Sequence, residues 1–196
     1  MYIVLEGIDG AGKTTQINAL KKWLEDSGIE SELIVEPTNS DIGVLIREML
    51  TKPNAVDENI QKTLGLLFAA DRLLLMEKLN KEEYCNKVII SDRSFYSSLA
   101  YQKPADWIFE INKYAKKPDL VLLLDIDVNL AIDRCSGEDE FEKKSFLSVV
   151  KSNYLGIAKS NDNFRIINAN NGPNKVQSDI RKSIAPFLGI CVDGID

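Results

Sequence analysis

The chain has 196 residues, of which 44% are hydrophobic and 28% are charged, and its formal net charge is −6. This length and composition are typical of one domain, spanning 1–196, with a full hydrophobic core. An acidic surface repels phosphate on average, so nucleic acid is not expected as a partner, and any anion site must be built from locally gathered cations and backbone dipoles.

Strand patterns alternate with helical patterns along the chain. Short, nearly continuous apolar runs predict strands at 2–6, 31–35, 87–91, 120–125 and 165–168. Helical spacing of apolar residues predicts helices at about 14–26, 42–50, 57–80, 95–117 in pieces, 128–134, 143–159 and 176–188. The alternation predicts an α/β fold of three layers, with a central parallel sheet of about five strands flanked by helices. Ligands of such folds bind at the carboxyl ends of the strands.

The first predicted strand leads into a glycine-rich loop. Residues 7–14 match the phosphate-binding pattern G-x-x-x-x-G-K-[ST], with a strand before them and a helix after them. Such a loop can point its N–H groups at a polyphosphate, while Lys13 reaches the β- and γ-phosphates and Thr14 holds Mg²⁺. The residues expected to bind ATP in this loop are Gly7, Asp9, Gly10, Ala11, Gly12, Lys13, Thr14 and Thr15.

Polar residues follow the next strands as well. Glu36-Pro37, Asp92-Arg93 and Asp125 stand where buried strands end, although Asp and Pro are also ordinary turn residues. Phe68 and Arg72 are four residues apart and share one face of a predicted helix. An aromatic ring there could stack on a base while the guanidinium donates to the base edge, or Phe68 could simply be a core residue.

These stretches together resemble the thymidylate kinase family. The match covers 6–15, Glu36-Pro37-Thr38 with Arg47, 67–72, and Asp92-Arg93 with 97–102; a weaker match runs from Arg134 to Phe146 and includes 153–155. The resemblance implies a P-loop kinase fold with a short lid at about 135–145. It also implies transfer of the γ-phosphoryl group of Mg·ATP to dTMP, giving dTDP and ADP, and a homodimer.

The resemblance also implies roles for single residues. Phe68 would stack on thymine, Arg72 would meet its O4, and Arg93 would clamp the acceptor phosphate with help from Arg47. Asp9 would take the 3′-hydroxyl group. The full set implied for dTMP is Asp9, Glu36, Pro37, Arg47, Phe68, Arg72, Arg93, Ser97, Ser98, Tyr101 and Gln102.

Further roles concern the donor and catalysis. Arg134 would pack on adenine, and Thr14 and Asp92 would hold Mg²⁺. The expected catalytic residues are Lys13, Asp92, Arg93 and Lys143. The segment 136–144 departs from the family, because it is acidic where an arginine is often found, and only Lys143 and Lys144 can supply positive charge there. Gly10 stands where one branch of the family has a basic residue.

Two alternatives stay open. The chain could phosphorylate another nucleoside monophosphate or a deoxynucleoside, or it could be a nucleotide-binding switch or interaction module. A guanine-reading switch would require an N-K-x-D segment, but the three Asn-Lys pairs, at 86, 112 and 174, lack the Asp.

The composition also indicates where the protein works. Histidine is absent, which excludes histidine-based catalysis and zinc sites. Cys85, Cys135 and Cys191 are isolated, as is typical of the reduced cytosol. No apolar run approaches the ~20 residues of a membrane helix, and no charged-then-apolar leader opens the chain. We expect a cytoplasmic protein without a membrane segment.

Overall fold

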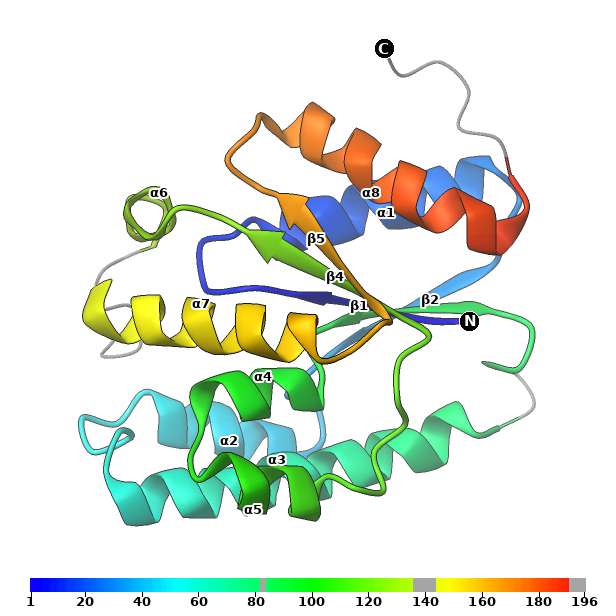
Figure 1. Ribbon diagram of the computed structural model, residues 1–196. Coiled ribbons are helices and arrows are strands. Elements are labelled where there is room, and N and C mark those ends of the chain that lie inside the picture. Colours follow the sequence, from blue (N-terminus) through cyan, green and yellow to red (C-terminus); the bar gives the residue numbers. More distant parts are fainter. Residues whose placement is uncertain (82–83, 136–143, 191–196) are drawn as a thin grey trace.

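The computed structural model describes residues 1–81, 84–135 and 144–190. In this part of the chain a sheet of five parallel strands has the order β2-β3-β1-β4-β5 (Figure 1). The strands are β1 (Tyr2–Glu6), β2 (Ser31–Val35), β3 (Val88–Asp92), β4 (Leu120–Asp125) and β5 (Phe164–Asn168). The predicted strands and their parallel arrangement are confirmed, although β3 begins and ends one residue later than predicted and β5 begins one residue earlier.

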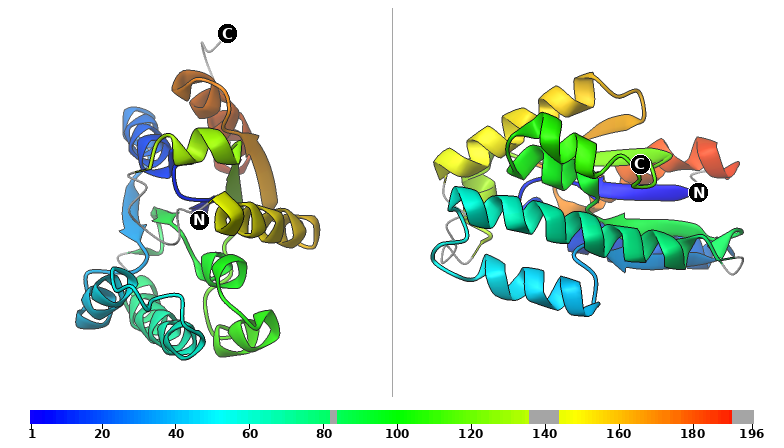
Figure 2. Two further views of the ribbon diagram at one scale, coloured as in Figure 1. Left: turned by 90° about the vertical axis from the view of Figure 1, so that its left-hand side faces the viewer. Right: turned by 90° about the horizontal axis from the view of Figure 1, so that it is seen from below.

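Helices cover both faces of the sheet. They are α1 (Lys13–Asp26), α2 (Asp41–Leu50), α3 (Glu58–Leu79), α4 (Phe95–Tyr101), α5 (Ala105–Ile111), α6 (Val128–Ile132), α7 (Lys144–Lys159) and α8 (Pro173–Leu188). Figure 1 shows α1 and α8 above the sheet and α3, α4 and α7 below it. In Figure 2, α2 lies beside α3, with which it makes many contacts. The three-layer α/β architecture predicted from the sequence is confirmed.

The two faces of β1 serve different layers because successive side chains of a strand point to opposite sides. Tyr2 and Val4 belong to the apolar cluster that includes Leu75 and Leu79 of α3. Ile3 and Leu5 belong to the cluster that contains the buried residues of α1 and α8. Glu6, the last residue of β1, is fully buried on the side of Tyr2 and Val4.

The segment 95–117 breaks into two helices around Pro104. α4 ends at Tyr101, and Pro104 is the N-cap residue of α5. Proline lacks an N–H group and disfavours a helical residue before it, which ends α4 and allows α5 to begin in a new direction. Figure 1 shows the two short helices one below the other.

The strand register brings the polar ends of the strands to one edge. Leu5 and Val35 both pair with Asp92, and Glu6 pairs with Leu123. The glycine-rich loop therefore emerges from the middle of the sheet, with the ends of β2 and β3 beside it. Among the described residues, no helix is both long and apolar enough to cross a membrane.

Candidate active site

The glycine-rich loop has a backbone that requires its glycines. Gly7, Gly10 and Gly12 have φ values of 147°, 79° and 89°, which side chains rarely adopt. A Cβ atom on Gly10 would lie 2.2 Å from the carbonyl oxygen of Ala131 in α6. Because α6 packs directly on the loop, this chain has no room for the basic residue that one branch of the family carries at this position.

The loop ends at the open N-terminus of α1. Gly12 is the N-cap residue and offers no side-chain cap, so the first N–H groups of the helix are free to bind an anion. Lys13 is 8% exposed, and its Nζ donates to the carbonyl oxygens of Gly7 at 3.1 Å and Ile8 at 3.2 Å. Burial, with a smaller contribution from Arg93, lowers the pKa of Lys13 to about 8.

A cleft of about 440 Å³ opens above this loop. We call it the loop cleft, and it is lined by Asp9, Gly10, Gly12, Lys13, Thr14, Thr15, Val35, Glu36, Asp92, Arg93 and Arg134. Arg134 lies against the loop, with its Nη1 donating to the carbonyl oxygen of Gly10 at 3.4 Å. The predicted ATP residues are thus gathered around one cleft, except Gly7 and Ala11, which belong to the loop but do not line it.

One residue of the loop cleft has an unmatched oxygen. Asp92 Oδ1 is buried and has no hydrogen-bond partner among the described residues, and Asp92 lines the cleft together with the exposed Thr14. A buried carboxylate oxygen without a donor is costly unless a ligand or ion satisfies it. One hydroxyl and one carboxylate beside a phosphate site are the kind of ligands that Mg²⁺ takes, because the ion keeps several waters and phosphate oxygens. These residues fit the expected ion.

A second cleft, of about 220 Å³, lies on the other side of Arg93. We call it the aromatic cleft, and it is lined by Asp9, Glu36, Pro37, Leu50, Gln61, Phe68, Arg72, Arg93, Ser94, Ser97, Ser98, Tyr101 and Gln102. Every residue that the resemblance implies for dTMP lines it, except Arg47. The two clefts share Asp9, Glu36 and Arg93 and therefore meet at these side chains.

Arg47 does not line the aromatic cleft. It is exposed on α2, and its guanidinium donates to the carbonyl oxygens of Pro37 at 2.6 Å and Thr38 at 2.8 Å. It thereby fastens the loop after β2 to α2. In this structure Arg47 supports the wall of the aromatic cleft without lining it.

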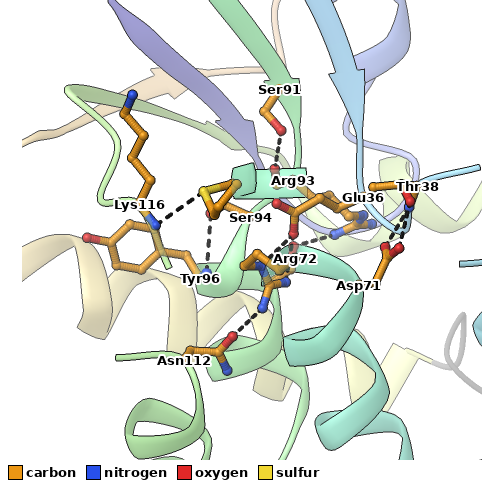
Figure 3. Close-up of polar contacts among 12 residues, drawn as sticks. Glu36, Thr38, Asp71, Arg72, Ser91, Arg93, Ser94, Tyr96, Asn112 and Lys116 are labelled. Atoms are coloured by element: carbon orange, nitrogen blue, oxygen red, sulfur yellow. Dashed lines mark hydrogen bonds and ion pairs between the residues drawn. The ribbon is translucent and has the colours of Figure 1, made fainter. Parts of the chain in front are cut away.

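Asp71 supports the same loop from α3. This carboxylate is 1% exposed and accepts hydrogen bonds from the backbone N–H of Thr38 at 2.7 Å, its hydroxyl at 2.6 Å and the Ser40 hydroxyl at 2.6 Å (Figure 3). Ser40 in turn caps α2. Sequence reasoning did not single out Asp71, although it precedes Arg72; only its buried position shows that it holds the loop.

Arg93 lies at the junction of the two clefts in an unusual backbone conformation. Its φ is 73°, in a region rare for residues other than glycine. Two hydrogen bonds hold the backbone there, because its N–H donates to Leu5 O at 3.1 Å and its carbonyl oxygen accepts from Ser91 Oγ at 2.6 Å. Strain of this kind concentrates at functional sites, where the surrounding structure maintains it.

The side chain of Arg93 is held from several sides. It forms an ion pair with Asp9, donates to Ser97 Oγ at 3.1 Å, and lies 5.3 Å from the ring centroid of Tyr101. Burial by itself would raise the pKa of Asp9, but Arg93 and Lys13 outweigh it and lower this pKa. Asp9 is therefore a carboxylate that links the two cations at the cleft junction.

Glu6 forms a buried hub below Arg93. Its carboxylate accepts hydrogen bonds from the hydroxyl groups of Ser94 at 2.7 Å, Ser97 at 2.7 Å and Tyr154 at 2.8 Å. Ser97 also accepts from Arg93, so the hub supports the clamp. The sequence placed Glu6 at a strand end but did not indicate this role, because its partners lie about 90 and 150 residues away.

Arg72 lies at the inner end of the aromatic cleft and is 3% exposed. Its Nε donates to Glu36 Oε2 at 2.7 Å, and its Nη1 donates to Asn112 Oδ1 (Figure 3). Burial raises the pKa of Glu36, and Arg72 opposes that rise. Phe68, one helical turn before Arg72, is half-buried and lines the same cleft. The two residues thus share one face of α3, as their spacing predicts.

Only the ends of the expected lid, 135 and 144–145, fall within the described residues. Lys143 and most of the predicted lid lie outside the described residues, and Lys144 is an exposed residue at the start of α7.

Comparisons with known proteins identify the family and the fold. The thymidylate kinase family model matches residues 5–180. A probable thymidylate kinase of Methanobrevibacter smithii is 63% identical over 195 residues, and one of Methanothermobacter thermautotrophicus is 48% identical over 195 residues, each alignment covering all of both chains. The structure of thymidylate kinase from Candida albicans superposes with a TM-score of 0.82 at 27% identity, covering 95% of this chain and 92% of that one. The fold is therefore that of the P-loop kinases, and the chain belongs to the thymidylate kinase family.

Proposed function

We propose that this protein transfers the γ-phosphoryl group of Mg·ATP to dTMP, giving dTDP and ADP. The observation that carries the proposal is the meeting of two clefts at Arg93, one built on a phosphate-binding loop and the other on Phe68 and Arg72. Membership of the thymidylate kinase family and the names of the relatives support it.

The loop cleft is the proposed donor site. Backbone N–H groups at the start of α1 and the Lys13 ammonium group receive the phosphates, and Arg134 lies beside the loop where it can pack on adenine. Thr14 and Asp92 would hold Mg²⁺, which neutralises phosphate charge when bound.

The aromatic cleft is the proposed acceptor site. Phe68 supplies an aromatic face for the pyrimidine, and Arg72 supplies N–H donors for thymine O4. Gln102 and Glu36 line this cleft, and the buried Oε1 atom of each has no hydrogen-bond partner in the described part of the chain. Either oxygen can accept a proton donor of the nucleotide, such as thymine N3–H. Ser97, Ser98 and Tyr101 complete the wall around the base and sugar.

Phosphoryl transfer requires alignment and charge stabilisation more than covalent chemistry by the protein. Arg93 lies between the clefts, where its guanidinium can hold the acceptor phosphate in line with the donor. Lys13 reaches the transferred group from the loop side. Asp9 orients Arg93 and can receive the 3′-hydroxyl group of the acceptor. Lys143 remains the proposed source of lid charge.

We further propose a cytoplasmic homodimer that binds no nucleic acid. Exposed leucines on α3, at 66, 73 and 74, share one side of the helix because seven or eight residues complete about two turns. Val44 and Leu45 are exposed on the neighbouring α2. An apolar face of this kind is suited to contact with a second copy of the chain.

An acceptor panel tests the proposed reaction. ADP release should be fastest with dTMP. Cytosine presents an amino donor to the Arg72 donors, and a buried unpaired group costs about 1–3 kcal/mol, so dCMP should be a poor acceptor. Uracil lacks only a methyl group, worth roughly 1 kcal/mol, so dUMP should fall within about two decades of dTMP.

Two results would contradict the proposal. One is AMP or GMP as the best acceptor, which would indicate a different monophosphate kinase. The other is nucleotide binding without acceptor-dependent ADP release, which would indicate a switch. Phe68→Ala should raise KM for dTMP while leaving KM for ATP near the parent value, because Phe68 lines the aromatic cleft but not the loop cleft.

A further inference from the structure

Asn112 is a buried polar residue outside every motif found in the sequence. It caps the C-terminal end of α5 and is 5% exposed. Its Oδ1 accepts a hydrogen bond from Arg72 Nη1, and its Nδ2 donates to Ile108 O at 2.8 Å, one turn earlier in α5 (Figure 3). It does not line the aromatic cleft, so it can act on a ligand only through Arg72.

Glu36 alone does not fix the orientation of Arg72. The Nε and Nη2 atoms of Arg72 both contact the same oxygen, Glu36 Oε2, each at 2.7 Å. Two contacts to one atom leave the guanidinium plane free to turn about that atom. The bond from Nη1 to Asn112 comes from a different element and removes this freedom.

The same contacts determine how many N–H donors of Arg72 remain for a ligand. A guanidinium group has five N–H donors, and Glu36 and Asn112 occupy three of them. Within the described part of the chain, two donors are left for a nucleotide in the aromatic cleft. Their direction depends on the plane of the guanidinium group, which three elements determine together: the end of β2, α3 and the end of α5.

We propose that Asn112 is a positioning residue that fixes the Arg72 guanidinium group and thereby determines how strictly the site distinguishes thymine from cytosine. This inference rests on the proposed function. A guanidinium fixed in place presents donors to O4 of thymine and cannot turn away from the amino group of cytosine. A guanidinium free to turn loses part of its contact with thymine and accepts cytosine at lower cost.

The two hydrogen bonds of Asn112 can be removed separately. Serine hydroxyls already bond to the carbonyl oxygen four residues earlier in this chain, as Ser27 does to Trp23 at 2.8 Å. Asn112→Ser can therefore keep the bond to Ile108 O, but its side chain is too short to reach Arg72. Asn112→Asp keeps an acceptor for Arg72 and loses the donor to Ile108.

The experiment compares kcat/KM for dTMP and dCMP in the parent and both variants, with KM for ATP as an internal reference. We expect N112S to raise KM for dTMP about tenfold and to reduce the preference for dTMP over dCMP about tenfold, with KM for ATP unchanged. We expect N112D to keep the parent preference. Asn112→Ala also lacks the acceptor and should shift the preference in the same direction as N112S.

Ile108→Val is the matched control, because it loosens the packing of the buried side chain of α5 without removing a partner of Arg72. It should keep the parent preference. If N112S and N112A are as selective as a dTMP-selective parent, or if I108V shifts the preference equally, the positioning role is wrong while the proposed function stands. A parent that does not phosphorylate dTMP contradicts the proposed function itself, and this role with it.

Discussion

At the scale of single residues, two cations of the site lie close together and share one carboxylate. Lys13 is buried beside Arg93, and Asp9 is the carboxylate that contacts both. Burial and the neighbouring Arg93 penalise the Lys13 ammonium group, while Asp9, Asp92 and Glu6 favour it. A polyphosphate in the loop cleft would add negative charge that favours the charged form of Lys13 further.

The lowered pKa of Lys13 predicts a proton uptake. In the ligand-free protein its pKa is about 8, so that above this pH the side chain is mostly neutral. Bound phosphates favour the charged form and raise the pKa, so nucleotide binding must take up a proton and the affinity must fall as pH rises beyond about 8. Calorimetry at about pH 9 in buffers of different ionisation enthalpy measures this uptake. Lys13→Met should abolish it, and an equal uptake in that variant would refute the assignment.

At the scale of elements, the loop between β2 and α2 is held by both of its neighbouring helices. Asp71 holds it from α3, Arg47 holds it from α2, and Gly43 lets α2 approach closely. A Cβ atom on Gly43 would lie 1.9 Å from the carbonyl oxygen of Thr38. The placement of Glu36 and Pro37 in the aromatic cleft therefore depends on contacts that lie outside it.

Gly43→Ala tests this dependence. Because the backbone must shift to admit the methyl group, we expect the free energy of unfolding to fall by about 1–3 kcal/mol and KM for dTMP to rise, with KM for ATP less affected. Gly156→Ala in α7 is the matched control, since no described atom beyond the adjoining residues and backbone of α7 lies within 4 Å of its added Cβ. It should raise stability by about 0.5–1 kcal/mol. Denaturant unfolding measures the stability of the two variants, and steady-state kinetics measure their KM values. A Gly43→Ala variant with the parent stability and the parent KM for dTMP would contradict the close approach.

At the scale of the whole molecule, an acidic protein gathers its scarce arginines where anions are expected. It has 24 Lys and Arg residues against 30 Asp and Glu residues. Arg72, Arg93 and Arg134 line the two clefts, and Arg47 holds a cleft wall. The general surface therefore disfavours polyanions, while the clefts can accept nucleotides.

The exposed apolar face of α2 and α3, formed by Val44, Leu45, Leu66, Leu73 and Leu74, predicts the oligomeric state. Leu66 is 54% exposed on this face, and a buried charge at a dimer interface is costly, so Leu66→Glu should convert a dimer to a monomer. Phe109→Glu is the control, because Phe109 is 60% exposed but belongs to α5 and not to α2 or α3. Sedimentation velocity should show a dimer for the parent and for F109E. A parent that sediments as a monomer would contradict the proposed dimer.

The sequence alone determined the strands, the helices, the glycine-rich loop and the shared face of Phe68 and Arg72. These features follow from short-range spacing, because apolar periodicity and backbone constraints act over a few residues. Their parallel order then placed the strand ends at one edge. The family resemblance named most of the residues that line the aromatic cleft, but not Leu50, Gln61 or Ser94, and it also named Arg47, which does not line the cleft.

Only the tertiary structure decided which side chains support the site. In the folded chain, Arg47 bonds to the loop after β2 and α6 packs against Gly10. Tyr154 donates a hydrogen bond to Glu6, which lies 148 residues away in the sequence. It also placed Asn112 against Arg72, 40 residues away. Such partners leave no local signal in one sequence, because packing between helices and strands, and not residue spacing, brings buried polar groups to the hydrogen bonds that they require.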